Sequence, residues 1–487
     1  MKNLVSGSKT LMRYIGSASI FEFLEAPLNI RLISGFAWIR IKMVTNNNGS
    51  QKSTIELILR ALKHKNYRLY FSGHGTSLIG TWMQQLAMSW LVYRLTNSAF
   101  YLGLVPFCSQ IPVFLGAPIA GVFADHCSKR KILITTQILS MVQAFFLSAL
   151  VFFDEINLVW IIVLSVLIGL INAFDIPTRQ AFVYEIVDDE EDLPNAIALN
   201  SLIFNTARLI GPTLAGILIA ITKNEYTCFF INGLSFLAVI FSLTAMKLTH
   251  RVHKKETPPI LQGLKDGIKY AYDFIPIRTV LVFTALISVL SVPYTVLMPI
   301  FARDILHGDS RTLGLLTSSI GIGALIGAIF LAIQKNPRKF ENIVVFAACV
   351  FSFGVIGFSF SKVLWLSLAI VILPGFGLMV QSASTNIILQ TIVDDDKRGR
   401  VMSFHVMAFV GTAPFGNLLA GFTAEKIGAP HTLVLCGLLT FCVMLYFLYQ
   451  VPRIRRLIHP IYVKKGIIPE VAQGLNTATQ IAAETKE

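Results

Sequence analysis

The chain has 487 residues, of which 54% are hydrophobic and only 14% are charged. An average soluble domain carries about 25% charged residues, so this composition excludes an ordinary soluble enzyme, a disordered protein and a coiled coil. The mean hydropathy of +0.66 indicates a membrane protein, in which the net charge of +14 is explained by basic inner loops rather than by a nucleic-acid partner.

Residues 1–65 are predicted to form an N-terminal cytoplasmic extension. Their apolar pieces, such as 30–44, contain Arg31, Arg40 and Lys42 and are too short and too charged to span a membrane. Met43 opens a polar leader, so we expect residues 1–42 to precede the natural start of the protein.

Twelve apolar runs follow, each long enough for a membrane-spanning helix and too long for the strands of a membrane barrel. The runs are 69–94, 100–124, 131–153, 157–178, 196–221, 227–247, 279–302, 312–334, 341–361, 363–388, 401–424 and 431–451. The sequence therefore predicts an all-α membrane protein with twelve transmembrane helices, because lipid leaves backbone groups no other partners.

The runs divide into two predicted six-helix bundles, 66–247 and 279–451, joined by a basic cytoplasmic linker, 248–278. Residues 178–216 and 385–421 resemble each other, since both read I-V-D-D and then continue into a Gly/Pro-rich helix that ends in L-A-G. Such a repeat is typical of transporters and predicts two pseudo-symmetric halves. Lys and Arg concentrate in alternate connections, which places both termini and the tail 452–487 in the cytoplasm.

A polar turn between the second and third runs contains Gly121, Asp125, Lys129, Arg130 and Lys131. Glycine permits close helix approach, while an acid at a membrane boundary needs a cation or a helix N-terminus. The segment resembles the gating loop of the major facilitator superfamily, with His126 and Ser128 as departures. The resemblance implies a latch in which Asp125 meets the start of the eleventh helix and a basic residue meets an acid low on the fourth helix.

Asp175, with Arg179 one turn later, is our candidate for that acid or for a proton site. We favour the latch role over the proton role, because Asp175 lies near the inner end of its run. A solvated turn that only sets the topology is the alternative reading of the loop itself.

The fifth run carries Arg208, Gly211, Pro212 and Gly216, which resemble the antiporter motif of exporting members of the superfamily. The glycines predict a flat packing face, and the proline allows a bend. A mid-membrane arginine usually faces a cavity with a partner, although one that snorkels to the inner interface is an equal alternative.

Further segments resemble the branch that includes the enterobactin exporter, macrolide efflux pumps and transmembrane secretion effectors. They are 80–98, 175–182, 193–201, 299–304 and 398–403, and the resemblance covers about 62–453. It implies a monomeric, multi-pass transporter of the bacterial inner membrane that exports a small amphipathic molecule, such as a siderophore or a macrolide-like drug, with proton antiport as the family's expected energy source.

Polar residues within the apolar runs are candidates for the cavity lining, although each could instead join two helices. These residues are Gln84, Gln85, Gln110, Asn172, Asn205, Gln381, Asn386 and His405. We find no catalytic constellation, nucleotide loop or metal-ligand spacing, so we expect neither enzyme activity nor a cofactor. An importer, a carrier of another metabolite and a non-transporting scaffold are the alternatives.

Overall fold

The computed structural model describes residues 28–31, 38–41, 44–45, 51–52, 59–187, 189–247, 269–334, 340–394 and 397–464. Side chains are described from residue 59 onward, except at 117–119, 121–122, 124–126, 190 and 464. Residues 248–268 of the predicted linker lie outside these ranges.

Two short antiparallel hairpins lie in the N-terminal extension, which the all-α prediction did not include. They pair β1 (Leu28–Arg31) with β2 (Trp38–Ile41), and β3 (Val44–Thr45) with β4 (Gln51–Lys52). The first hairpin has a physical basis, because apolar and polar residues alternate along LNIR and along Ile39–Ile41 with the period of a strand.

Helices account for nearly all of the described chain from residue 59 onward. The first group, called here the N-terminal helices, follows the single-turn η1 (Arg60–Lys63) and consists of α4 (Lys65–Thr96), α5 (Ala99–His126), α6 (Lys129–Phe152), α7 (Leu158–Ile186), α8 (Leu193–Thr222) and α9 (Tyr226–Ala245), with η2 (Glu190–Asp192) before α8.

The second group, called here the C-terminal helices, contains two segments whose helical geometry changes part-way. It consists of α11 (Ile275–Ser291), η3 (Val292–Thr295), α12 (Met298–Ile300), the π-helical η4 (Phe301–Ile305), α13 (Ser310–Ile333), α14 (Phe340–Ser359), α15 (Leu364–Ile392), α16 (Arg398–Val406), the π-helical η6 (Met407–Gly411), α17 (Ala413–Ile427) and α18 (Ala429–Lys464).

Eleven segments of the described chain are long and apolar enough to cross a membrane, one fewer than the twelve predicted. The difference is α4, which has 32 residues but includes polar stretches such as SGHGTS and TWMQQ. These polar residues have a structural reason, because α4 packs between α8 and α9 and buries His74 and Ser77 instead of presenting them to lipid.

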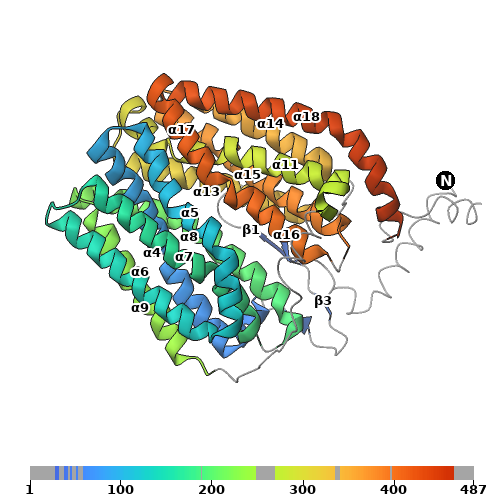
Figure 1. The fold of residues 1–487 in the computed structure, drawn as a ribbon, viewed down its shortest axis with the longest axis horizontal. Helices are drawn as coiled ribbons and strands as arrows, with labels where there is room; N and C mark the ends of the chain where they lie inside the picture. The colour runs from blue at the N-terminus through green and yellow to red at the C-terminus, as the bar shows by residue number, and fades with distance from the viewer. Residues whose placement is uncertain are drawn as a thin grey trace, which may run out of the picture.

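The two groups show the same internal packing, as the sequence repeat leads one to expect. In the first group α4 packs on α8 and α9, α5 on α7, and α6 on α9. In the second group α11 packs on α17 and α18, α13 on α15, and α14 on α18. Figure 1 shows the blue-to-green N-terminal helices on one side of the molecule and the yellow-to-red C-terminal helices on the other.

The two groups meet through two helix pairs, α8 with α13 and α5 with α17. Small residues allow this close approach. A Cβ added to Gly103 of α5 would lie 2.3 Å from the carbonyl oxygen of Asn417, and one added to Gly216 of α8 would lie 2.6 Å from that of Ser310. The glycines therefore let backbone meet backbone across the boundary between the groups.

Several helices continue beyond the predicted spans, because membrane thickness limits an apolar run but not a helix. α7 runs to Ile186, eight residues past the predicted end at 178. α18 runs to Lys464, so the predicted tail begins inside a helix. Ile454, Ile458 and Tyr462 recur every four residues on α18 and are buried, which is the pattern of a helix packed along one face.

Candidate functional site

A buried polar cluster lies among the N-terminal helices, towards the end of the molecule at which α6 begins, called here the Lys129 end. Its centre is Asp175 of α7, which is 5% exposed. One carboxylate oxygen accepts hydrogen bonds from the Thr136 hydroxyl and the Gln137 amide of α6, both at 2.7 Å. The other oxygen accepts from Arg179 Nε at 2.9 Å and also from Arg179 Nη2.

Arg179 connects this carboxylate to α4. Its Nη1 donates to the ring of His74, which is 8% exposed and stacks on Tyr70 with a centroid separation of 5.2 Å. Residues from three helices thus share one ion-pair network. Of its members, the sequence predicted only Asp175 and Arg179; His74 and Gln137 were missed, although both are polar residues within apolar runs.

Lys129 of the loop forms an ion pair with a different acid from the one predicted as its latch partner. Lys129 Nζ lies 2.5 Å from Glu185 Oε1, near the end of α7, so Asp175 is not the partner of the loop. The reason is the length of α7, because Glu185 is ten residues beyond Asp175 and therefore about 15 Å nearer the Lys129 end. A basic loop residue does meet an acid low on the fourth long helix, as the resemblance implied.

The other basic residues of the loop differ in their contacts with the helices. Arg130 donates to the Thr244 carbonyl oxygen at the end of α9, over 2.6 Å, and Lys131 is exposed. The Asp125 side chain lies outside the described residues, as do the surroundings of Gly121 apart from its place in α5. The predicted contact of Asp125 with the eleventh span therefore stays a prediction.

A second ionic cluster fastens η1 to the start of α8 at the same end. The carboxylate of Asp192, whose side chain is 1% exposed, lies 2.6 Å from Lys63 Nζ and 2.8 Å from His64 Nε2, and it also pairs with Arg60. Burial acts to raise the pKa of this carboxyl, but hydrogen bonds from Lys63 and His64 and the charge of Arg60 outweigh it, so the pKa is lowered.

The fifth-helix motif packs as its small residues predict. A Cβ at Gly211 would lie 2.6 Å from Trp82 Cβ, so this glycine faces α4, while Gly216 faces α13 and Pro212 lies inside α8. Arg208 lies with its guanidinium carbon 5.7 Å from the Trp82 ring centroid. It lies in the middle of α8, and whether it faces a cavity or snorkels to the inner interface stays a prediction.

The predicted lining residues separate into two classes. Gln84 joins three helices, since it accepts from Asn232 at 2.7 Å and donates to Gln143 at 3.3 Å. His405 is 4% exposed and lies 3.3 Å from the Thr385 hydroxyl. These two act in packing, which was the structural alternative.

The other predicted lining residues are more open, with one exception. Gln381 is 1% exposed, and neither amide atom has a hydrogen-bond partner among the described residues. The remaining members, which are exposed or half-buried, are Gln85, Gln110, Asn172, Asn205 and Asn386.

Polar contacts between the two groups gather at the opposite end of the molecule, called here the Asn97 end, where α4 finishes and α5 begins. Tyr93 donates to Asp304 of η4, and Arg303 donates to Asn97 Oδ1 at 2.6 Å. Ser98 donates to Glu425 of α17 at 2.9 Å. This end is therefore fastened across the boundary between the groups.

The described cross-group contacts become fewer toward the Lys129 end. Along the α8–α13 pair they continue from Gly216 and Ser310, through Thr213 and Ser318 at 2.6 Å, to Gly321. Farther toward the Lys129 end the two helices expose apolar side chains, with Ile197 and Leu202 on α8 and Ile326, Ile329 and Ile333 on α13. The described polar contacts between the groups therefore lie at the Asn97 end and along the middle of the α8–α13 pair, and none is described at the Lys129 end.

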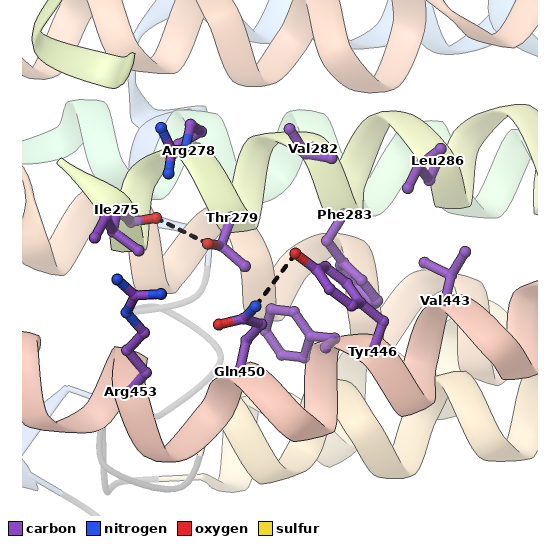
Figure 2. A pocket seen from close by; sticks show the side chains of 11 residues that line it. Ile275, Arg278, Thr279, Val282, Phe283, Leu286, Val443, Tyr446, Gln450 and Arg453 are labelled. Carbon is purple, nitrogen blue, oxygen red and sulfur yellow. Dashed lines mark hydrogen bonds between the residues drawn. The ribbon is translucent and has the colours of Figure 1, made fainter. Parts of the chain in front are cut away.

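A groove of about 200 Å³ lies between α11 and α18 (Figure 2). Arg278 and Arg453 lie at one end of it, and Leu286 and Val443 lie at the other. It opens on the side of α11 opposite the buried Thr284, and none of the predicted site residues lines it.

The sequence of this protein matches the family model described as transmembrane secretion effector over residues 58–463. The chain belongs to this family of the major facilitator superfamily. It is 27% identical to the staphyloferrin A transporter of Staphylococcus aureus over 391 residues, which is 78% of this chain and 95% of that protein. It is 23% identical to macrolide efflux protein A of Streptococcus pyogenes, covering 78% of this chain and 96% of the relative.

A third relative, the multidrug efflux pump Tap of Mycolicibacterium fortuitum, is 24% identical over 78% of this chain and 94% of its own length. Among solved structures, the fold is similar to a bacterial homologue of the lysosomal transporter Spinster in an inward-facing, occupied conformation, with a TM-score of 0.63 and 11% identity over 82% of this chain and 98% of that one. A peptide transporter has a TM-score of 0.64 at 13% identity, over 81% and 95%. The predicted fold family and transporter class are confirmed.

Proposed function

We propose that this protein exports a small amphipathic molecule by alternating access, and that the structure represents its inward-open state. The observation that carries the proposal is the one-sided fastening of the two helix groups. Contacts such as Tyr93–Asp304 and Ser98–Glu425 close the Asn97 end, while no polar contact between the groups is described at the Lys129 end. Rocking the groups about α5–α17 and α8–α13 would open the opposite side.

The Lys129 end is proposed to face the cytoplasm of a bacterium, with the protein in the inner membrane and both termini inside. Its connections carry Lys129, Arg130 and Arg398, whereas the Asn97 end carries isolated cations such as Arg94 and Arg311. This asymmetry is the usual topological signal. With α4 counted as a span, the chain has twelve, in six-helix bundles over 66–247 and 279–451.

The Lys129–Glu185 contact is proposed to hold the inward-open state as part of the gating loop. The Asp175–Arg179 pair is proposed to stiffen the same end of the N-terminal helices, because it is completed by α4 and α6 within a single helix group. Proton antiport remains the proposed energy source.

The export direction and substrate class are supported by the names of the relatives, of which two are efflux proteins and one is a siderophore transporter. Import of a metabolite and a scaffold role without transport are the competing functions. No feature of the described residues favours either.

Accumulation in cells that lack or overproduce the protein tests this function. The compounds would include siderophores, macrolides and cationic dyes, each measured with and without a protonophore. We expect lower accumulation of at least one class in the overproducing cells and loss of that effect with the protonophore. Higher accumulation would establish import, and no change for any class would favour the scaffold role. Export that persists with the protonophore would refute proton coupling alone.

A further inference from the structure

The central arginine of α8, Arg208, has no anionic partner among the described residues. Arg208 is fifteen residues from Leu193 and fourteen from Thr222, so it lies about 21 Å from either end of the helix. Its guanidinium makes no hydrogen bond or ion pair with any of the described residues. A charge at mid-membrane depth is costly and normally marks a ligand or ion pathway.

Carboxylates that could neutralise Arg208 are engaged elsewhere. Four carboxylates on the described spanning segments each contact another side chain. Asp175 pairs with Arg179 and Glu185 pairs with Lys129. Asp304 accepts a hydrogen bond from Tyr93, and Glu425 accepts one from Ser98. Glu341 lies at the start of α14, at the other side of the C-terminal helices. The described residues therefore provide no counter-ion for Arg208.

The surface of α8 on which Arg208 lies can be found from its neighbours. In the second half of α8 the exposed apolar residues, Ile210, Leu214, Ile217 and Ile221, lie on one side, which is the side expected to face lipid. Gly211 contacts α4, and Thr213 contacts α13. At 100° per residue, these contacts place α4 and α13 on either side of the helix.

Arg208 projects between those two neighbours, on the side away from lipid. Ser201 and Asn205 precede it on the same strip, and both are at least partly exposed although they face the interior of the molecule. A strip that faces inward and is still exposed borders the space between the two helix groups. The path proposed for the substrate therefore passes Arg208.

The surroundings of Arg208 present an aromatic surface and free donors. The Trp82 ring lies under the guanidinium at 5.7 Å, and Phe204 packs edge-on against Trp82 at 5.6 Å. A cation–π contact of this kind engages no N–H donor in a conventional hydrogen bond, so the guanidinium donors stay available to a ligand. Across the boundary, the fully buried hydroxyl of Tyr294 also has no hydrogen-bond partner among the described residues, and it lies within the electrostatic range of Arg208.

We infer that Arg208 binds an anionic group of the transported molecule, and that the substrate is an organic anion with an apolar or aromatic body. A carboxylate matches the fork of guanidinium donors, and Trp82 and Phe204 would contact the body. This inference rests on the proposed transport function and names the charge class of its substrate. It favours an anion over the cationic drugs that an amphipathic cavity could otherwise accept.

Three probes that share one aromatic body and differ in charge test the inference. They are 1-pyrenebutyrate, its neutral N-methyl amide and the cationic 1-pyrenebutylamine. Binding to the purified full chain in lipid nanodiscs is measured by energy transfer from tryptophan to pyrene, with empty nanodiscs correcting for partition into lipid. We expect the wild type to bind the carboxylate at least tenfold more tightly than either analogue, as expected for a charge-assisted pair.

Variants distinguish recognition from packing. Arg208→Gln should remove the preference for the carboxylate and leave binding of the neutral amide within about twofold. Arg208→Lys, which keeps the charge and loses the planar fork, should retain part of the preference. Arg311→Gln is the matched control, because Arg311 is an exposed cation at the Asn97 end, and it should behave as the wild type.

Equal or tighter binding of the amine by the wild type would overturn the inference, as would failure to bind any probe. An equal loss for all three probes in Arg208→Gln would assign the residue to packing. If that variant does not fold, the wild-type preference and Arg208→Lys decide. If the amine or the amide is exported and the carboxylate is not, the anion site is refuted while the proposed export function stands. If the carboxylate is bound selectively but is not exported, the export function is refuted while the anion site stands.

Discussion

The ion pair between Asp175 and Arg179 offers a quantitative test of the buried cluster. The pair is largely removed from solvent, with side-chain exposures of 7% for Asp175 and 19% for Arg179. Asp175→Asn would leave the Arg179 charge without its counter-ion, which typically costs about 3–5 kcal/mol when a buried pair is broken. Thr136→Val removes one hydrogen bond, donated by an uncharged hydroxyl to the same carboxylate, and should cost less, about 1.5–3 kcal/mol.

The double variant Asp175→Asn with Arg179→Gln removes both charges, so its cost should be clearly smaller than the sum of the two single costs. Unfolding of the purified protein by SDS titration in mixed micelles gives the four free energies of this cycle. Coupling of more than about 1 kcal/mol is expected for contacting residues. Additivity within about 0.5 kcal/mol, or an Asp175→Asn cost no larger than that of Thr136→Val, would refute the reasoning.

Three further predictions concern the two ends of the molecule. Lys129→Glu should impair transport, because the new carboxylate would be repelled by Glu185. The double variant Lys129→Glu with Glu185→Lys should restore part of the transport rate, as measured by export assays with expression controls. A double variant no more active than Lys129→Glu alone would contradict this. The lowered pKa of Asp192 stabilises the docking of η1 above the ordinary carboxyl pKa of about 3.9, and this stability is lost as the pH falls through the folded pKa. The hydrogen-exchange protection factors of residues 60–64, which correct for the slower intrinsic exchange in acid, should therefore fall in acid. Asp192→Asn should remove that dependence, and equal pH profiles of the protection factors in both proteins would refute it. Gly103→Val should prevent closure of the Asn97 end, because even a Cβ would lie 2.3 Å from the Asn417 carbonyl oxygen. A cysteine introduced as Ser98→Cys should then react several-fold faster with a membrane-impermeant maleimide than the same cysteine with Gly103 intact. Unchanged labelling would show that the helices adjust to the larger side chain.

Periodic apolar runs were sufficient to predict the helices, because lipid leaves the backbone no other way to pair its polar groups. They were less informative for α4. This helix lies among its neighbours and does not need an apolar surface all round, so its composition alone does not identify it as a span.

The candidate site was predictable where the partners are close in the sequence. Asp175 and Arg179 are four residues apart on one helix, and such pairs meet wherever the helix forms. Glu185 was missed as the partner of Lys129 because the apolar run ends before α7 does. Gln84 was assigned to the cavity because a polar residue in an apolar run reads the same whether it faces a substrate or another helix.

The sequence by itself thus determined the membrane class, the helices, the repeat and the positions of Arg208 and its Gly/Pro neighbours, all of which depend on local composition and spacing. Only the tertiary structure decided which end of the molecule is fastened, which acid meets Lys129, and that Arg208 stacks on Trp82 without a counter-ion among the described residues. These features depend on contacts between helices more than 50 residues apart in the chain, and no local pattern specifies them.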